Sequence, residues 1–400
     1  MREIDFSEDN LGNRWLGVKG IWNLMQGEVK RLVKVGLERV LVFEQGARVG
    51  CRRYKWSKAR RGYRNGSYVR DLLTSYGWIE GLLVPRVREG GIESEVLERY
   101  RRRQRQVDKV LLEAFLLGHS TRKAVRLFKR LFESSISAQT VSNIVKGLNE
   151  QVQRFHRRPL GDIYRFLYLD GLWITLHKPV RVKKVLLVAL GVRMDGSKEL
   201  LSFQLASSES ESWWWGFLSD LKSRGLKGEN LEVMVSDGAS GLIKTFCALF
   251  PRVDRQLCTF HKASDLGLHL VNKGHHNQII SDALYIFEAE TATEVRGRLR
   301  VFCDKWFTKE PKAVRNFIKG FEYCLTYLEY PEPIRTMLKT NNPIERYLQE
   351  LRRRIIPMRA FNNSRSVERI IYGVIASVLN QQSYRSVGQG VPENEFTQLP

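Results

Sequence analysis

Cysteine is scarce in this 400-residue sequence, with five residues widely scattered along the chain. An odd and dispersed set cannot supply a disulfide framework, so reduced thiols are expected. No apolar run approaches the roughly 18 residues of a membrane-spanning helix. The first residues, MREIDFSEDN, lack the charged-then-apolar layout of a signal peptide. We therefore expect a cytoplasmic protein with no membrane partner.

Acidic residues are outnumbered as well. Aspartate and glutamate number 43 against 66 lysines and arginines, a formal net charge of +23. This excess goes beyond what solubility requires and indicates a polyanionic partner. Nucleic acid fits better than a membrane surface because the charge is spread over several segments. With 43% hydrophobic residues, the chain can bury a sizeable core in two or three domains, which excludes intrinsic disorder.

Two aspartates follow apolar runs in the middle of the chain. Asp170 comes after YRFLYL and Asp237 after LEVMVS, and each precedes a glycine. The pattern between them predicts, in order, strand 164–170, strand 184–192, strand 200–206, helix 210–224 and strand 231–236. Short loops make the first three strands antiparallel, and the helical crossover lets the fourth run parallel to the first. The result is a mixed sheet.

If the first and fourth strands are neighbours, Asp170 and Asp237 lie side by side. Two close carboxylates repel each other, so one of them should have a raised pKa unless a cation lies between them. An all-oxygen pair of this kind suits Mg²⁺ or Mn²⁺. The alternative is that both are ordinary acids at strand ends.

The N-terminal part divides into a helical lead-in, residues 1–50, and a basic aromatic segment with a β-hairpin, residues 51–92. Basic groups neutralise phosphates and aromatic rings can stack, so the second segment suits nucleic-acid contact. The alternative is a solvated basic face whose aromatic rings lie in the core. The candidates for DNA contact are Arg60, Arg61, Tyr63, Arg64 and Asn65.

Residues 93–160 have a helical pattern. A first helix should begin at the capping residue Ser94 and include the arginine-rich run RYRRRQR, and two more should begin at Ser120 and Ser137. The last two helices predict a helix-turn-helix that could enter a DNA major groove, although plain packing or dimerisation is the alternative. Its candidate DNA-binding residues are Gln139, Thr140, Ser142 and Asn143.

The C-terminal third is helical in pattern. Residues 263–336 are too long for a loop and predict an inserted helical subdomain, after which residues 337–400 contain a marked helix start. Asn342 is a good N-cap and Pro343 occupies the first turn, so Glu345 could serve merely to complete a capping box.

Against the capping box, the same helix carries basic residues that suit DNA contact: Arg346, Arg352, Arg353 and Arg354. A glutamate among such arginines is costly for a DNA binder, because it repels phosphates. A metal ion bound to Glu345 would reverse that cost.

An ordered series of motifs resembles the Mutator-type transposases of insertion sequences, a family of DDE enzymes on an RNase H-like core. The series is RRGYRNG from Arg60, VPRVR, GHSTRKAV, SAQTVSNI, LDG at Asp170, ES at Glu209 with a tryptophan five residues later, SDG at Asp237, QLC-x-x-H, N-x-I-E-R at Glu345 and SVERIIY. It runs from about residue 60 to about residue 380. A lone D-D-E set would be weak support, but this ordered series is strong.

This resemblance implies an α/β fold: an RNase H-like catalytic core that begins in residues 161–262, is interrupted by the helical insertion and is completed by residues 337–400. Asp170, Asp237 and Glu345 become the catalytic, metal-binding triad, which holds two Mg²⁺ or Mn²⁺ ions. Cys258 and His261 match the family's C-x-x-H and would support the active site. Plain burial, or a zinc site completed by His269, His275 or His276, is the alternative for this pair.

The implied activity is nicking of the ends of an insertion sequence and their joining to target DNA by hydrolysis and transesterification. The implied partners are the terminal inverted repeats, target DNA and further copies of the chain, in a homodimer or larger synaptic complex at the nucleoid. Two rival readings are a non-catalytic sequence-specific DNA-binding regulator and an RNase H-like nuclease without strand transfer. The family's tryptophan aligns with Trp214, for which core packing and DNA stacking are the alternatives.

Overall fold

The computed structural model describes residues 18–55, 57–88, 92, 94–98, 101–117, 119–132, 135–176, 181–356, 361 and 363–386. The chain forms two compact units. The first holds most described residues up to Val145, and the second holds the described residues from Lys146 onward. Among the described residues, no helix is both long and apolar enough to cross a membrane. All five cysteines are free, as expected.

A long helix and a hairpin form the first part of unit 1. Helix α1 (Val18–Val49) packs on β1 (Arg64–Thr74) and β2 (Gly77–Val87), which are antiparallel, so the predicted hairpin is confirmed. The turn is tight because Gly77 has a φ of +100° and accepts a hydrogen bond from the Thr74 hydroxyl. The shared core is apolar and consists of Leu41, Leu72, Ile79, Leu82, Val84 and Leu97.

The predicted arginine-rich helix from Ser94 is wrong in its first half. Helix α2 (Arg105–Leu116) begins only at Arg105. Before it, the backbone lies beside the end of β1: the Leu73 amide donates to Arg102 O, and the Gln104 amide donates to Leu73 O. These bonds satisfy the backbone groups that a helix would otherwise have paired, so the segment stays extended.

Two short helices complete unit 1 and agree with the predicted starts. Helix α3 (Thr121–Phe132) is capped by Ser120, whose hydroxyl accepts from the Lys123 amide. Helix α4 (Ala138–Lys146) is capped by Ser137, which accepts from the Thr140 amide. Their buried residues, which include Phe128 and Val141, leave the opposite sides of both helices exposed.

A five-stranded mixed sheet forms the centre of unit 2. It contains β3 (Tyr164–Leu176), β4 (Val182–Arg193), β5 (Lys198–Ala206), β6 (Val233–Ser236) and β7 (Asp254–Leu257), in the order β5-β4-β3-β6-β7. The first three strands are antiparallel, and β6 runs parallel to β3, as the sequence predicted. The sequence did not predict β7, which pairs parallel with β6.

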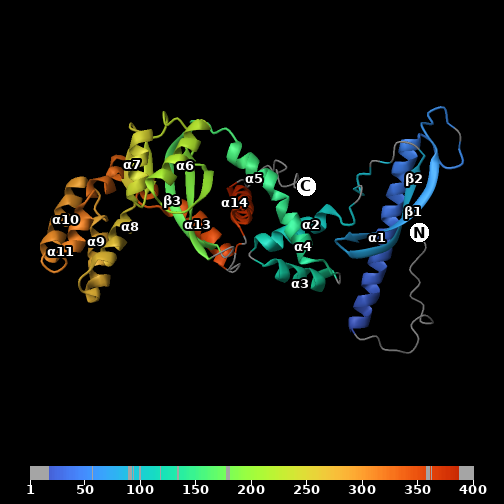
Figure 1. The fold of residues 1–400 in the computed structure, drawn as a ribbon, viewed down its shortest axis with the longest axis horizontal. Coiled ribbons are helices and arrows are strands. Elements are labelled where there is room, and N and C mark those ends of the chain that lie inside the picture. Colours follow the sequence, from blue (N-terminus) through green and yellow to red (C-terminus); the bar gives the residue numbers. More distant parts are fainter. Residues whose placement is uncertain are drawn as a thin grey trace. The chain divides into compact units, whose positions relative to one another are not determined.

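Helices cover both faces of this sheet (Figure 1). On one face, α6 (Glu211–Ser223) and α7 (Ser240–Leu249) pack on alternate residues of β3 such as Leu167 and Leu169. Contacts from α5 (Leu148–Arg157), α13 (Asn342–Ile355) and α14 (Ser364–Ser386) involve β3, β5 and one another. Successive strand residues point to opposite faces, so Phe166, Tyr168 and Asp170 share the face opposite Leu167.

Residues 263–336 are all described and contain helices but no strand. The longer ones are α9 (His276–Ile286), α10 (Ala292–Trp306) and α11 (Pro311–Ile318), drawn in orange in Figure 1, with α8 (Thr259–Ser264) before them and α12 (Ile334–Leu338) after them. They have an apolar core of their own, with Phe302, Trp306 and Phe317 at its centre. This core adjoins the sheet through Leu257 at the end of β7.

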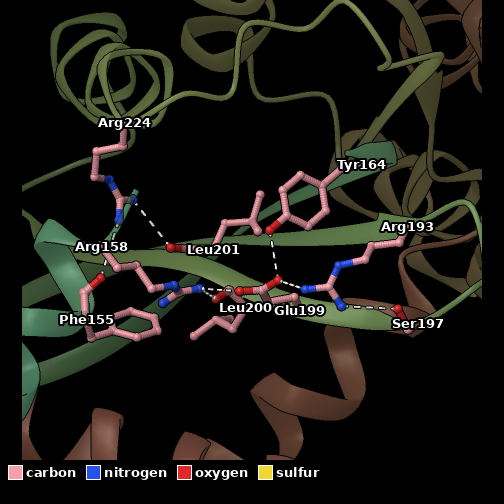
Figure 2. A network of polar contacts seen from close by, with 9 residues as sticks. All are labelled: Phe155, Arg158, Tyr164, Arg193, Ser197, Glu199, Leu200, Leu201 and Arg224. Carbon is pink, nitrogen blue, oxygen red and sulfur yellow. Dashed lines mark hydrogen bonds and ion pairs between the residues drawn. The ribbon is translucent and has the colours of Figure 1, made fainter. Parts of the chain in front are cut away.

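A network of hydrogen bonds and ion pairs connects the start of β3 to β4, to β5 and to the segment after α5 (Figure 2). The Glu199 carboxylate on β5 accepts hydrogen bonds from Arg158, from the Tyr164 hydroxyl at 2.8 Å and from Arg193. Arg158 and Arg224 also donate to carbonyl oxygens of β5. One half-buried acid therefore holds together the segment after α5 and three strands, at the opposite end of β3 from Leu176.

Candidate active site

The register of β3 and β6 brings two acids together. The last paired residues of the two strands are Tyr168 and Val235, and Asp170 and Asp237 each lie two residues further along. The same register therefore places Asp170 beside Asp237, as expected from the strand order. Contrary to the expectation of a strand end, β3 continues past Asp170 to Leu176, because β4 pairs with it along that whole length.

Asp170 is buried, with 9% of its surface exposed. Burial raises the pKa of Asp170 to about 7, with the negative charges of Asp237 and Glu345 adding to this. The Gly171 amide, which donates to Asp170 Oδ1 at 2.7 Å, and the nearby His261 act in the opposite direction. Asp170 therefore lies close enough to both Asp237 and Glu345 for their negative charges to act on it, which is the electrostatic situation that a bound cation relieves.

Glu345 is held near Asp170 by hydrogen bonds that the segment before α13 makes with the rest of unit 2. The Tyr168 hydroxyl donates to Met337 O at 2.9 Å. The Lys339 carbonyl accepts from both the amide and the hydroxyl of Thr259, at 3.1 and 3.0 Å. The Asn341 amide then contacts the Cys258 thiol sulfur at 3.4 Å. These bonds fix residues 337–341 against β3 and the start of α8, so the first turn of α13 begins beside the sheet.

The start of α13 does not form the capping box that the sequence allowed. Asn342 is the first helical residue, and Asn341 occupies the cap position without a side-chain capping bond. The Asn342 amide instead meets the Thr340 hydroxyl at 3.4 Å. Glu345 Oε1 lies 3.6 Å from His261 Nε2, so the carboxylate faces the histidine.

His261 and Cys258 belong to this cluster. Cys258 is buried, and its amide donates to Ser236 O at the end of β6. Hydrogen bonding to Cys258, together with the charges of Asp170 and Glu345, raises the pKa of His261 to about 9 despite its partial burial. At neutral pH the ring is therefore a cation close to Asp170 and Glu345.

Among the described residues, none of His269, His275 and His276 joins Cys258 and His261 in a group that could hold a metal ion. His275 contacts the buried Glu310 carboxylate at 2.8 Å, and His276 meets Asn277. Within the described part of the chain, no three His, Cys, Asp or Glu side chains are arranged to hold a metal ion. The triad nevertheless fits Mg²⁺ or Mn²⁺ in chemistry, because carboxylate oxygens are the ligands these ions prefer, and its side chains would have to converge further on the ion.

Glu209 is a residue whose position the sequence did not predict. A Cβ added to Gly171 would lie 2.6 Å from Glu209 Oε1, so the glycine of the LDG motif makes room for this carboxyl. Burial raises the pKa of Glu209, and Asp237 contributes. Because Gly171 and Asp170 point to opposite faces of β3, Glu209 borders the cluster from the α6 side. The ES motif was its only signal in the sequence.

Trp214 is a core residue. It is buried against Phe217, with ring centroids 5.8 Å apart, inside the cluster between α6 and the sheet. The DNA-stacking alternative for Trp214 is therefore wrong. Trp215 on the same helix is exposed instead.

The first group of candidate DNA-binding residues lies just before and within β1. Arg60 stacks on Tyr63, with its guanidinium carbon 4.2 Å from the ring centroid, and both Arg61 and Asn65 are exposed. Arg64 is partly committed to the fold, since it donates to Cys51 O at 2.6 Å. The exposed Tyr63 agrees with contact to a partner better than with a core position.

The remaining candidates lie on two helices. On α4, Gln139 and Asn143 are exposed and bonded to each other at 2.9 Å, whereas Thr140 and Ser142 are half-buried. On α13, Arg346, Arg352 and Arg353 are all exposed. Contact of these residues with DNA stays a prediction. Arg354 is buried and pairs with Glu350, so its expected place among the DNA-facing arginines is wrong.

The sequence of this chain is similar to those of known transposases. The family model for "Transposase, Mutator family" matches residues 19–384. The transposase for insertion sequence element ISRM5 of Rhizobium meliloti (strain 1021) is 31% identical over 344 residues, covering 86% of this chain and 85% of that protein. The transposase for insertion sequence element IS256 in transposon Tn4001 of Staphylococcus aureus is 31% identical over 343 residues, covering 84% and 86%.

One solved structure shows a weaker similarity. It is a Drosophila P element transposase strand transfer complex, with 11% identity and a TM-score of 0.32 over 73% of this chain and 82% of that chain. A similarity of this size supports no inference about the present fold.

Proposed function

Since the chain belongs to the Mutator family of transposases, we propose that it nicks the ends of an insertion sequence and joins them to target DNA. The proposed fold of its catalytic part is RNase H-like, which the sheet order β5-β4-β3-β6-β7 supports. The proposed site of action is the nucleoid in the cytoplasm, and the proposed substrates are terminal inverted repeats and target DNA.

The observation that carries this proposal is that Asp237 and Glu345, from distant parts of the sequence, both lie close enough to the buried Asp170 to raise its pKa. A fold that only binds DNA gains nothing from gathering several acids at one place, because they repel phosphates. Two Mg²⁺ ions, when bound, would activate a water or 3′-hydroxyl on one side of a phosphodiester and stabilise the leaving oxygen on the other.

Each acid has a distinct position for this task. Asp170, the deepest of the three, would hold the ions from β3, Asp237 would hold them from the turn after β6, and Glu345 would complete the site from α13. Charged His261 offsets the charge of Glu345 and presents an N–H donor to a phosphate oxygen. Cys258 positions His261.

The proposed assembly is a homodimer or larger complex, because two element ends must be held together. Helix α1 supports this: Trp22, Met25, Val29 and Leu32 are exposed at a 3-4-3 spacing, and exposed Phe43 follows two heptads after Val29. Such a heptad stripe suits a second helix with the same stripe, so its proposed occupant is α1 of another copy. A 32-residue helix is about 48 Å long, enough for a standard-size interface.

The test uses labelled element ends, Mg²⁺ and a plasmid target. We expect cleavage at the ends followed by covalent transfer to the plasmid, and loss of both reactions in Asp170→Asn, Asp237→Asn and Glu345→Gln. Binding without cleavage would instead indicate a regulator, and cleavage without joining would indicate a nuclease.

A further inference from the structure

A cavity of about 390 Å³ opens beside Asp237 in unit 2. Its walls come from the turn after β6, from α7 and β7, and from the helices of residues 259–325. Leu257, Leu266 and Phe317 give it a buried apolar floor. Because Asp237 is shared, whatever occupies this cavity lies next to the reacting phosphodiester of the proposed function.

Positive charge dominates the rest of the lining. Four cations, Lys244, Arg255, Lys262 and Lys319, face two acids, Asp237 and Asp265. Among the described residues, Arg255, Lys262 and Lys319 form no ion pair with an acid. Lys262 is instead held by two backbone carbonyls, Asn316 O at 3.1 Å and Lys319 O at 2.8 Å. The excess of positive charge in the lining therefore favours binding of an anion in the cavity.

A flat surface stands beside these cations. The Arg255 guanidinium lies over the Tyr323 ring, with its central carbon 3.8 Å from the ring centroid. Arg255 projects from β7, which is paired to β6, so the stack is anchored to the sheet that carries Asp237. A stacked guanidinium and phenol can receive a nucleobase, whose face is flat and polarisable.

An anionic group beside a flat ring is the chemistry of a nucleotide. Resting on the proposed function, we propose that this cavity receives one unpaired nucleotide of the DNA strand next to the cleaved phosphodiester. Its base stacks on Arg255 and Tyr323, and its phosphate contacts the lysines. An enzyme that holds a nucleotide outside the duplex pays unstacking energy of a few kcal/mol and gains a fixed position for the neighbouring phosphodiester.

The experiment uses duplex element ends in which 2-aminopurine, whose fluorescence reports base unstacking, replaces one base at a time around the cleavage point. The full chain is added without divalent ions, so that binding is measured without cleavage. We expect a several-fold fluorescence change at one position next to the cleavage point. Tyr323→Ala should abolish this change, as should Arg255→Lys, which keeps the charge but removes the planar group.

A matched control is available in the same helical region. Arg298 lies over Tyr285 at 4.1 Å, outside the cavity lining, so Tyr285→Ala removes a similar stack and should leave the signal intact. The inference is overturned if no position responds, if Tyr323→Ala and Arg255→Lys keep the signal, or if Tyr285→Ala loses it equally.

Failure of this inference is distinguishable from failure of the proposed function. Wild-type chain that cuts and joins labelled ends but shows no 2-aminopurine change overturns the cavity assignment alone. Wild-type chain that binds the ends and never cuts them overturns the transposase activity itself.

Discussion

The imidazole of His261 faces the carboxylate of Glu345, with Nε2 3.6 Å from Oε1. The two residues come from different segments, α8 and α13, so their approach depends on the tethers that hold residues 337–341. Because the two groups are this close, a substitution of Glu345 should change the pKa of His261.

His261 should therefore titrate above its ordinary range. Its raised pKa, about 9 in the folded chain, contributes stability that is fully present below the ordinary value of 6.5 and is lost as pH rises through 9. We expect His261→Gln to lower the melting temperature at pH 6 and to have little effect at pH 10. His119→Gln, an exposed substitution, is the control. NMR titration should give a lower His261 pKa in Glu345→Gln; an unchanged value would contradict the coupling.

Asp170 should make the metal-free protein less stable as pH rises. The pKa of the Asp170 carboxyl is 3.8 in the unfolded chain and about 7 in the folded chain. Between these values the folded chain keeps a proton that the unfolded chain has lost, so the free energy of unfolding falls from pH 4 to pH 7. We expect Asp170→Asn to flatten this fall and to gain at most about 4 kcal/mol at pH 8, since one pKa unit corresponds to about 1.4 kcal/mol. Thermal unfolding across pH measures it. Asp195→Asn, in an exposed turn, should show no such gain.

Divalent ions should reverse the repulsion among the three acids. Adding Mg²⁺ or Mn²⁺ at pH 8 should raise the melting temperature of the wild-type chain. At an ion concentration 100 times the dissociation constant, the free energy of unfolding should rise by about 2.7 kcal/mol. Asp170→Asn and Glu345→Gln should lose most of this rise, whereas Asp195→Asn should keep it. Equal rises in all four proteins would show that the ion binds elsewhere.

The exposed amides of α4 should read DNA sequence. Gln139 and Asn143 can pair with base edges, so the double substitution to alanine should weaken binding to element ends by roughly 10- to 100-fold while binding to unrelated DNA changes little. Lys123→Ala on α3 is the comparison, because the exposed Lys123 is expected to contact only phosphates and its loss should weaken both kinds of binding alike. Fluorescence anisotropy at several salt concentrations distinguishes the two effects. Equal losses on both DNAs for the double variant would exclude base reading.

The apolar stripe of α1 should hold two copies together. A charge at Leu32 would be buried between the two helices, so Leu32→Glu should convert the assembly to a monomer, measured by light scattering after size-exclusion chromatography. Val69→Glu places the same charge on an exposed apolar position of β1 and should not change the mass. A monomeric wild-type chain would refute this assignment.

The sequence predicted the elements whose signals are local. Loop lengths and the helical crossover were enough to predict that β3 and β6 can be neighbours, and the two strands do pair. Ser120 and Ser137 correctly predicted the starts of α3 and α4. Strand β7 was missed because its DRQL sequence has no apolar alternation, and it becomes a strand only through pairing with β6.

The errors came from long-range pairing. Arg102 and Gln104 bond to Leu73, about 30 residues earlier, and this contact overrides the helical preference of the run. Likewise, nothing in the sequence around Glu345 shows that it faces His261. That position depends on hydrogen bonds such as the one between Tyr168 and Met337, 169 residues apart.

The hydrogen bond from Tyr168 to Met337 has a consequence during synthesis. A ribosome-bound chain that has emerged only as far as α11 already contains Asp170 and Asp237, yet it has neither the bond that docks the last segment nor Glu345. On the proposed function, such a chain therefore lacks one of the three acids, so cutting would require a chain whose translation is nearly finished.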